Sequence, residues 1–156
     1  MILLYLSFCI AFLYCLIIIS ITWGWVQIPH YKNTGTASAF ISIIIPVRNE
    51  ENHIASLLND IEKQRYSPGK FEVLIIDDHS TDASREKVTG FSSLSKHISY
   101  YAPDESRQGK KQALLFGISQ SKGELIITLD ADCNVGEHWL SSIAAYYEGT
   151  KPAFIM

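Results

Sequence analysis

The first stretch of the chain is apolar without interruption, and its hydrophobic positions show no polar alternation. Ile2 to Thr22 covers 21 residues without a charged side chain. A helix of this length spans about 31 Å at roughly 1.5 Å per residue, which matches the hydrocarbon core of a bilayer. Aromatic and basic residues follow it, as at a membrane–water boundary: Trp23, Trp25, His30, Tyr31 and Lys32. The pattern predicts one transmembrane helix with its interfacial residues over 1–31.

A cleaved signal peptide is the alternative for this segment. The segment lacks a basic n-region, its apolar run is too long, and no clear small-x-small cleavage site follows it. The first basic residue, Lys32, comes after the apolar run. Since basic residues favour the cytoplasmic side, we expect an inner-membrane protein whose remaining chain is cytoplasmic.

After a polar linker over 32–40, two hydrophobic patterns alternate. Continuous apolar runs predict buried strands at 41–47 and 71–76, and two further strands are predicted at 98–101 and 124–129. Apolar residues at helical spacing predict helices, near 54–61, 83–91, 107–120 and 140–147. Residues 154–156 have the pattern of a further strand that has barely begun. The alternation predicts an α/β domain over 41–156, with a mostly parallel sheet and helices on both faces.

Composition and charge narrow the function classes. Lys and Arg total 13 against 16 Asp and Glu, for a formal net charge of −3, which argues against a nucleic-acid binder that works by bulk positive charge. Hydrophobic residues make up 47% of the chain, too many for a disordered protein. The 3 cysteines exclude a disulfide scaffold.

Polar residues gather directly after the first two predicted strands. Ligands of parallel sheets bind outside the carboxyl ends of the strands, so these residues are candidates for chemistry. The first strand is followed by Arg48, Asn49, Glu50 and Glu51, and the second by Asp77, Asp78, His79 and Ser80. Helix capping is the structural alternative: Asn49 for the helix near 54–61, and Ser80 or Asp82 for the next.

Two carboxylates, Asp130 and Asp132, follow the fourth predicted strand. Carboxylates so close repel each other unless a cation lies between them, and oxygen ligands of this kind suit Mg²⁺ or Mn²⁺. An ordinary surface loop is the alternative. The pattern favours a divalent-cation site.

Three cations, Arg107, Lys110 and Lys111, mark the start of a predicted helix. Cations are unfavourable there by roughly 0.3–1 kcal/mol each, and a bound anion would remove the conflict. The alternative is a solvated patch that Asp104 and Glu105 partly neutralise.

Together, the cation site and the cationic helix start suit a nucleotide diphosphate. Asp77 or Asp78 would then bind the base or the ribose. Neither the dinucleotide-binding nor the P-loop glycine motif occurs, and the histidines and Cys133 show no zinc spacing.

Four ordered segments resemble the motifs of family-2 glycosyltransferases of the membrane-anchored bacterial type. They are IIPVRNEE (44–51), VLIIDDHSTD (73–82), RQGKKQAL (107–114) and LDADC (129–133). The resemblance covers residues 42–156 and implies the nucleotide-binding half of a GT-A fold, which is Rossmann-like.

The resemblance also implies roles for residues. Those that would bind the donor are Pro46, Val47, Arg48, Glu50, Asp77, Asp78, Arg107, Gly109, Lys110, Asp130 and Ala131. Within this set Asp78 would contact the base and Asp77 would support its loop. Asp130 and Asp132 match the Asp-x-Asp motif, with Asp132 as the direct metal ligand. Arg107 stands near a place where the family commonly has Asn.

The reaction implied is metal-dependent, inverting transfer of a sugar from a nucleotide sugar, expected to be a UDP-sugar. The acceptor would be a saccharide or lipid hydroxyl in polysaccharide or glycolipid synthesis. In the family the general base belongs to the second half of the domain, so we expect it beyond Met156 and the domain to be truncated at its C-terminus.

Two other functions compete with this interpretation. A haloacid-dehalogenase-type phosphohydrolase also uses Asp-x-Asp after an apolar strand, although normally after the first strand of its domain. A membrane-tethered nucleotide-sugar-binding module without catalysis would keep the same donor residues.

Overall fold

The structure is a computed structural model that describes residues 1–27, 37–104, 106 and 108–153. The chain divides into two compact units, Met1–Lys32 and Asn33–Met156. Some sequence predictions lie outside the described residues: the contribution of Arg107, the interfacial His30, Tyr31 and Lys32, most of the linker, and the strand start at 154–156.

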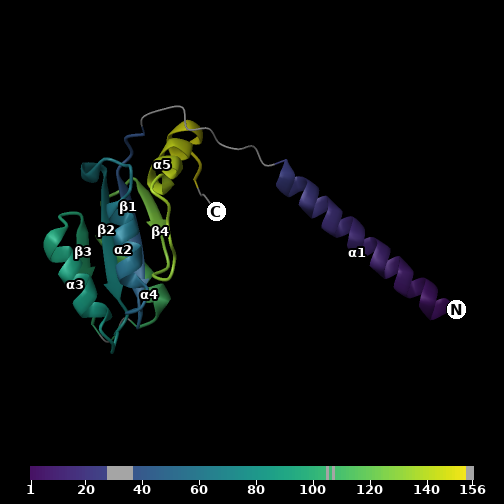
Figure 1. The fold of residues 1–156 in the computed structure, drawn as a ribbon, viewed down its shortest axis with the longest axis horizontal. Helices are drawn as coiled ribbons and strands as arrows, with labels where there is room; N and C mark the ends of the chain where they lie inside the picture. The colour runs from purple at the N-terminus through teal and green to yellow at the C-terminus, as the bar shows by residue number, and fades with distance from the viewer. Residues whose placement is uncertain (28–36, 105, 107, 154–156) are drawn as a thin grey trace. The chain divides into compact units, whose positions relative to one another are not determined.

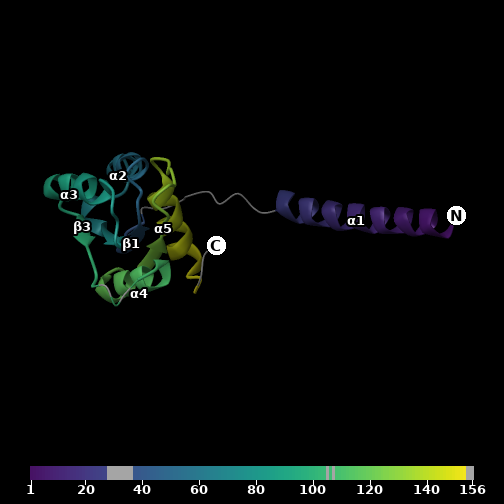
Figure 2. The same ribbon diagram turned by 90° about the horizontal axis from the view of Figure 1, so that it is seen from below.

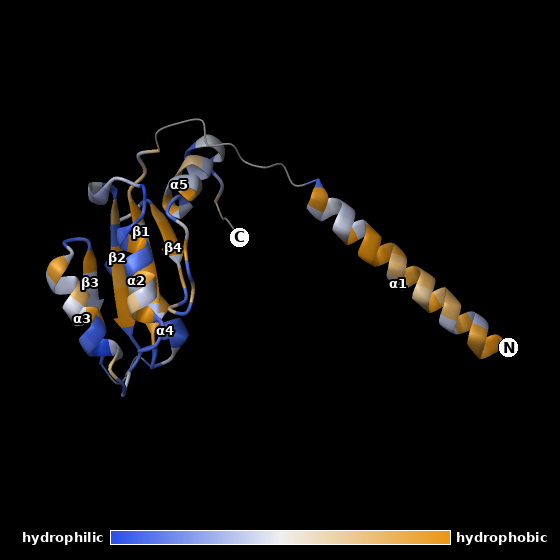
Figure 3. Ribbon diagram, viewed as in Figure 1, coloured by the Kyte–Doolittle hydropathy of each residue, from blue (hydrophilic) through white to orange (hydrophobic). Residues whose placement is uncertain are grey.

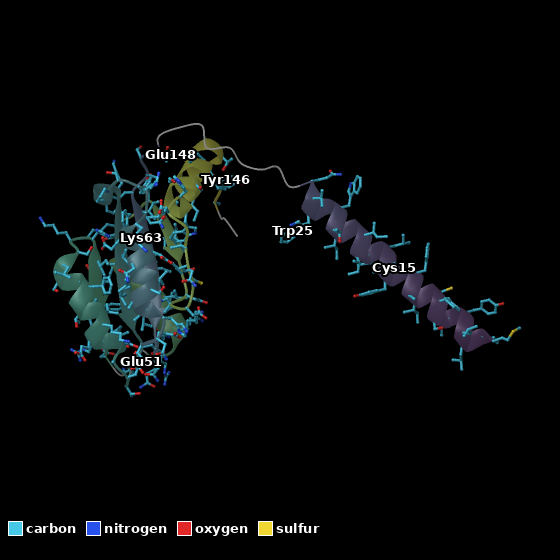
Figure 4. The ribbon with its side chains drawn as sticks, viewed as in Figure 1. Cys15, Trp25, Glu51, Lys63, Tyr146 and Glu148 are labelled. Carbon is cyan, nitrogen blue, oxygen red and sulfur yellow. The ribbon has the colours of Figure 1, made fainter. Side chains whose placement is uncertain are left out.

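The described residues of the first unit form one helix, α1, over Ile2–Val26. It has a mean hydropathy of 2.8 and runs four residues further than the charge-free stretch predicted, so that it includes Trp23 and Trp25. Orange, the colour of hydrophobic residues, predominates along it in Figure 3; Cys15 and Trp25 are labelled on it in Figure 4. At about 1.5 Å per residue it is long enough to cross a membrane.

The second unit is built on a four-stranded parallel sheet with the order β3-β2-β1-β4 (Figure 1). The strands are β1 (Ile41–Val47), β2 (Phe71–Asp77), β3 (Ile98–Tyr101) and β4 (Leu125–Thr128). Ile41 pairs with Phe71 on one side and with Leu125 on the other. The two long strands are almost wholly buried, because their continuous branched apolar residues face helices on both sides. The predicted α/β class is confirmed.

Helices cover both faces of the sheet, as Figure 2 shows. The five helices and turns of this unit are α2 (Ile54–Glu62), the short 3₁₀ turn η1 (Pro68–Lys70), α3 (Ser84–Leu94), α4 (Lys110–Gln120) and α5 (Trp139–Thr150). The odd-numbered residues of β1 form one core with α2, α3 and α5. Ile44, on the other face, forms a second core with Ala113 of α4.

The chain reverses its direction of travel across the sheet after β3. From β1 it moves outward to β2 and β3, with α2 and α3 on one face, and α4 then returns it to β4 on the far side of β1. Gly117 permits the close approach of α4, because a Cβ there would lie 2.4 Å from Ile44 Cγ2. The switch point of the topology therefore lies between β1 and β4, where open parallel sheets bind ligands.

The structure corrects one predicted helix start and does not support one capping alternative. Helix α4 begins at Lys110 rather than at 107, because Gly109 before it has φ +94°, outside the helical region. Asn49 does not cap α2, which begins at Ile54 without a side-chain cap; Asn49 itself has φ 57° and turns its side chain toward the next loop.

Candidate functional site

A cleft of about 430 Å³ opens at the switch point. Its lining residues come from the loops after β1, β2 and β4 and from the start of α4: Pro46, Val47, Arg48, Glu50, Asp78, Gly109, Lys110, Asp130, Ala131 and Asp132. Figure 3 shows the strands in orange and the loops past their carboxyl ends mostly in blue. Segments up to 86 residues apart in the sequence thus form one polar hollow, of a size that suits a small ligand.

One wall of the cleft is made rigid by hydrogen bonds between the loops after β1 and β2. The backbone N–H groups of residues 49–51 donate to side chains of the second loop, in turn Ser80 Oγ (3.1 Å), Ser84 Oγ (2.8 Å) and Asp82 Oδ2 (3.1 Å). The second loop donates back, from Thr81 N to Asn49 Oδ1 (2.8 Å) and from Ala83 N to Glu51 Oε2 (3.0 Å). Glu51 is labelled at this end of the sheet in Figure 4.

These reciprocal bonds explain why the capping alternative does not hold for the first loop. The side chains of Asn49 and Glu51 accept bonds from the neighbouring loop instead of capping α2. Asp82 serves both loops, because its Oδ2 accepts from Glu51 N and its Oδ1 accepts from Ser84 N (3.0 Å) at the start of α3. Partial burial raises the pKa of Asp82, but hydrogen bonds from Ser84 and from the Glu51 backbone outweigh it and leave that pKa below its ordinary value. The loops therefore hold a fixed shape before any ligand arrives.

Asp77 does not line the cleft and instead holds the loop after β2 in place through hydrogen bonds. It is buried, its Oδ1 accepts a bond from Ser80 N (2.9 Å), and its Oδ2 accepts one from the Tyr100 hydroxyl. Burial and the bond to Asp77 raise the pKa of Tyr100. Both carboxylate oxygens are engaged, so Asp77 shapes the loop that presents Asp78.

Asp78 joins three segments of the cleft. It is 5% exposed, its Oδ1 accepts a 2.7 Å bond from the Gly109 backbone N–H, and its Oδ2 lies 3.5 Å from Arg48 Nη1. The positive φ of Gly109 brings that N–H within reach. Asp78 therefore fixes the start of α4 against the end of β2.

The opposite wall carries two exposed carboxylates and an ammonium group. Asp130 and Asp132 are exposed on either side of the buried Ala131, and Lys110 Nζ lies 2.8 Å from Asp130 Oδ1. The bond to Asp130, with further attraction from Asp132, raises the pKa of Lys110. The cation that relieves the carboxylate repulsion here is thus the side chain of Lys110.

The donor set at this wall fits a divalent cation that is shared with a ligand. Among the described residues, no group of three His, Cys, Asp or Glu side chains is placed to hold a metal. Asp130 and Asp132 offer carboxylate oxygens at the cleft, and Mg²⁺ is commonly held by one or two carboxylates together with substrate phosphates and waters.

Of the described residues that the family resemblance assigned to the donor or the metal, the structure places all but Asp77 in the lining of the cleft. The lining does not include five other polar candidates: Asn49, Glu51, His79, Ser80 and Lys111. Arg107 lies outside the described residues. Sequence reasoning did not find Tyr100, nor the bond from Gly109 to Asp78. An aromatic residue on a short strand has no pattern that reveals such a role, and the contact joins residues 31 positions apart.

The family model described as "Glycosyl transferase family 2" matches residues 42–156. Among curated proteins, glycosyltransferase AglE of Haloferax volcanii is 37% identical over 111 residues, which are 71% of this chain and 36% of AglE. Poly(ribitol-phosphate) beta-N-acetylglucosaminyltransferase TarS of Staphylococcus aureus is 30% identical over 108 residues, 69% of this chain and 18% of TarS. The chain therefore spans about a third or less of the length of these relatives.

Solved structures share the fold. A crystal structure of residues 1–349 of TarS in complex with UDP matches with a TM-score of 0.64 and 26% identity, over 72% of this chain and 33% of that one. The mannosyltransferase PcManGT from Pyrobaculum calidifontis, solved in complex with GDP-Man and Mn²⁺, matches with a TM-score of 0.73 and 24% identity, over 85% and 39% of the two chains.

Proposed function

This chain belongs to glycosyl transferase family 2, and on that premise we propose that it binds the donor of a metal-dependent, inverting glycosyltransferase. The donor is a nucleotide sugar, specifically a UDP-sugar, and the acceptor is a hydroxyl of a saccharide or a lipid. Membership in a transferase family removes the haloacid-dehalogenase-type alternative. One observation carries the proposal: all four sequence motifs contribute to one cleft at the switch point of the sheet.

The rigid wall is assigned to the nucleoside. Pro46 and Val47 offer apolar surface, while Arg48, Glu50 and Asp78 offer groups for hydrogen bonds to the base and ribose. The structure of TarS that contains UDP supports a uridine nucleotide for this chain, by analogy within the family. Asp77 has a positioning role behind Asp78.

The opposite wall is assigned to the diphosphate and a divalent cation, Mg²⁺ or Mn²⁺. Asp130 and Asp132 would hold the cation, Asp132 directly, and Lys110 would approach the phosphate oxygens. A bound cation supplies electrostatic stabilisation of the charge that develops on the departing diphosphate. The residues 41–156 form the donor-binding domain in this proposal, and residues 32–40 its linker.

Helix α1 is proposed as a membrane anchor. Its length, its hydropathy and its covering of apolar side chains all suit a bilayer. The basic residue that follows it, Lys32, favours a cytoplasmic position for the donor-binding domain at the inner membrane. Cytoplasmic placement would give the domain access to nucleotide sugars.

Calorimetric titration of the detergent-solubilised chain with UDP, GDP and ADP tests the donor assignment. We expect UDP to bind at least about tenfold more tightly than the others when Mn²⁺ is present, a difference of about 1.4 kcal/mol, and EDTA to weaken that binding. Tighter binding of GDP would contradict the uridine assignment, and binding that EDTA leaves unchanged would contradict the metal.

Release of UDP from UDP-sugars tests catalysis. We expect release that depends on added membrane lipids or oligosaccharides as acceptors, with inverted anomeric configuration in the product. Tight UDP binding without acceptor-dependent release by the native protein would favour the non-catalytic donor-binding module.

A further inference from the structure

An ion pair crosses the wall of the cleft that the proposed function assigns to the cation. Lys110 Nζ and Asp130 Oδ1 are 2.8 Å apart, and the two side chains are 61% and 54% exposed. The pair joins the first residue of α4 to the loop after β4. A carboxylate proposed to hold a divalent cation is therefore already neutralised by a side chain of the same protein.

We propose that Lys110 is the resident counter-cation of Asp130, and that it transfers to the diphosphate when cation and nucleotide bind together. The inference rests on the proposed function and deepens it. It makes Lys110 a positioning residue that couples two binding events in one cleft.

The coupling follows from charge balance. A divalent cation that binds alone beside Asp130 and Asp132 competes with Lys110 for the charge of Asp130, and so weakens the attraction that holds the ammonium group. When a nucleotide diphosphate binds at the same time, its phosphate oxygens accept the ammonium. Each ligand thus binds more tightly in the presence of the other, by the same factor in both directions.

The backbone around Lys110 allows this exchange without movement of the fold. Gly109 is fixed by its N–H bond to Asp78 (2.7 Å), and α4 follows directly from it. Beyond this fixed point, the lysine has a flexible four-carbon stem that carries a compact charge. In this proposal the ammonium group moves from Asp130 to the diphosphate while the Cα of Lys110 stays in place.

The size of the effect follows from the exposure of the pair. Ion pairs between exposed side chains contribute roughly 0–1 kcal/mol, which corresponds to at most about a fivefold change in a binding constant. We therefore expect removal of Lys110 to tighten binding of the cation alone by about two- to fivefold, and to lower the coupling to the nucleotide by a similar factor.

The experiment measures Mn²⁺ binding to the full chain in detergent micelles, from the electron paramagnetic resonance signal of free Mn²⁺. Each protein is titrated without nucleotide and with saturating UDP. Lys110→Gln removes the pair, Lys110→Arg keeps the charge, and Lys70→Gln removes one positive charge from η1 at the opposite end of the sheet. We expect only Lys110→Gln to bind Mn²⁺ alone more tightly and to show weaker coupling to UDP.

Two results would overturn the inference while leaving the proposed function intact. In one, Lys110→Gln binds Mn²⁺ no more tightly than Lys70→Gln; in the other, its coupling to UDP equals that of the wild type. A wild type that binds Mn²⁺ in neither titration would overturn the metal-dependent function itself, and the inference with it.

Discussion

The two ends of the sheet use polar residues in opposite ways. At the amino end, the buried Ser42 of β1 donates to Glu72 (2.7 Å) and accepts from the N–H groups of Lys122 (3.2 Å) and Gly123 (2.8 Å). At the carboxyl end, Arg48, Lys110, Asp130 and Asp132 line an open cleft. The polar groups at the amino end are satisfied among themselves, whereas these four side chains of the cleft keep access to solvent.

The two ends of the sheet also differ in backbone conformation. Three of the four described residues with positive φ stand beside the cleft: Asn49, His79 and Gly109. Such conformations cost about 1–3 kcal/mol in a non-glycine residue and persist only where surrounding contacts impose them. Here the interlocked loops supply those contacts.

The largest effect is expected from the carboxylates that follow β4. Asp132→Asn should weaken Mn²⁺-dependent binding of UDP by more than about 100-fold, because loss of even an outer partner of a metal ligand costs 10- to 100-fold. Glu124→Gln makes the same charge change just before β4 and should leave binding unchanged. Calorimetry measures both. Equal losses in the two variants would contradict the division between the ends.

The second-largest effect is expected from Gly109→Ala. Its φ of +94° is strained for any side chain, although the space around the glycine is open, so we expect a cost of about 1–3 kcal/mol. Rotation of this residue would break its bond to Asp78 and misplace Lys110, lowering UDP affinity by about tenfold. Gly69→Ala in η1, where a Cβ also has open space, is the matched control. UDP affinity unchanged by Gly109→Ala would show that the bond to Asp78 is dispensable.

The sequence predicts the elements better than it predicts their connections. Continuous apolar runs locate the four described strands, and for β1 and β2 the reason is burial on both faces, which leaves no polar alternation. Hydrophobic spacing also locates α2 near the predicted range of 54–61, with Ile54, Leu57, Leu58 and Ile61 buried. The start of α4 is misplaced because a glycine at positive φ gives no hydrophobic signal.

Candidate site residues are predictable where chemistry follows a strand end. Asp130 and Asp132, predicted in this way, line the cleft, as do Arg48, Glu50 and Asp78. The distinction between Asp77 and Asp78 is not predictable from one sequence, because it depends on Tyr100 and Gly109, 23 and 31 residues away. Neighbouring carboxylates on a strand point to opposite faces, and only the tertiary contacts decide which one meets the cleft.

At the amino end, Ser42→Ala should lower stability without changing ligand binding. The substitution removes the acceptor of the Gly123 N–H, and an unsatisfied buried donor costs about 1–3 kcal/mol. Thermal unfolding should show the loss, whereas UDP affinity of the folded protein should equal that of the wild type. Ser119→Ala is the control, because that hydroxyl is exposed and its bonds, to Phe116 O (2.7 Å) and from Gln120 Nε2 (3.3 Å), stay within α4. A change in UDP affinity with Ser42→Ala would contradict the claim that polar groups at the amino end stabilise the fold without affecting ligand binding.

The smallest effect concerns Glu148 of α5, labelled at the amino end in Figure 4. Its Oε1 accepts bonds from Ser38 N (2.7 Å) and Ala39 N (2.8 Å), and these bonds, first that from Ser38, hold its pKa below the ordinary value of 4.5. A lowered folded-state pKa stabilises the protein above the unfolded-state pKa, and this stabilisation is lost as the pH falls through the folded-state value. Glu148→Gln should therefore have a shallower loss of stability below about pH 4.5 than the wild type in urea unfolding at several pH values. Glu124→Gln serves as the charge-matched control. If the free energy of unfolding falls with pH equally steeply in the wild type and in Glu148→Gln, this carboxylate does not hold the start of the domain against α5.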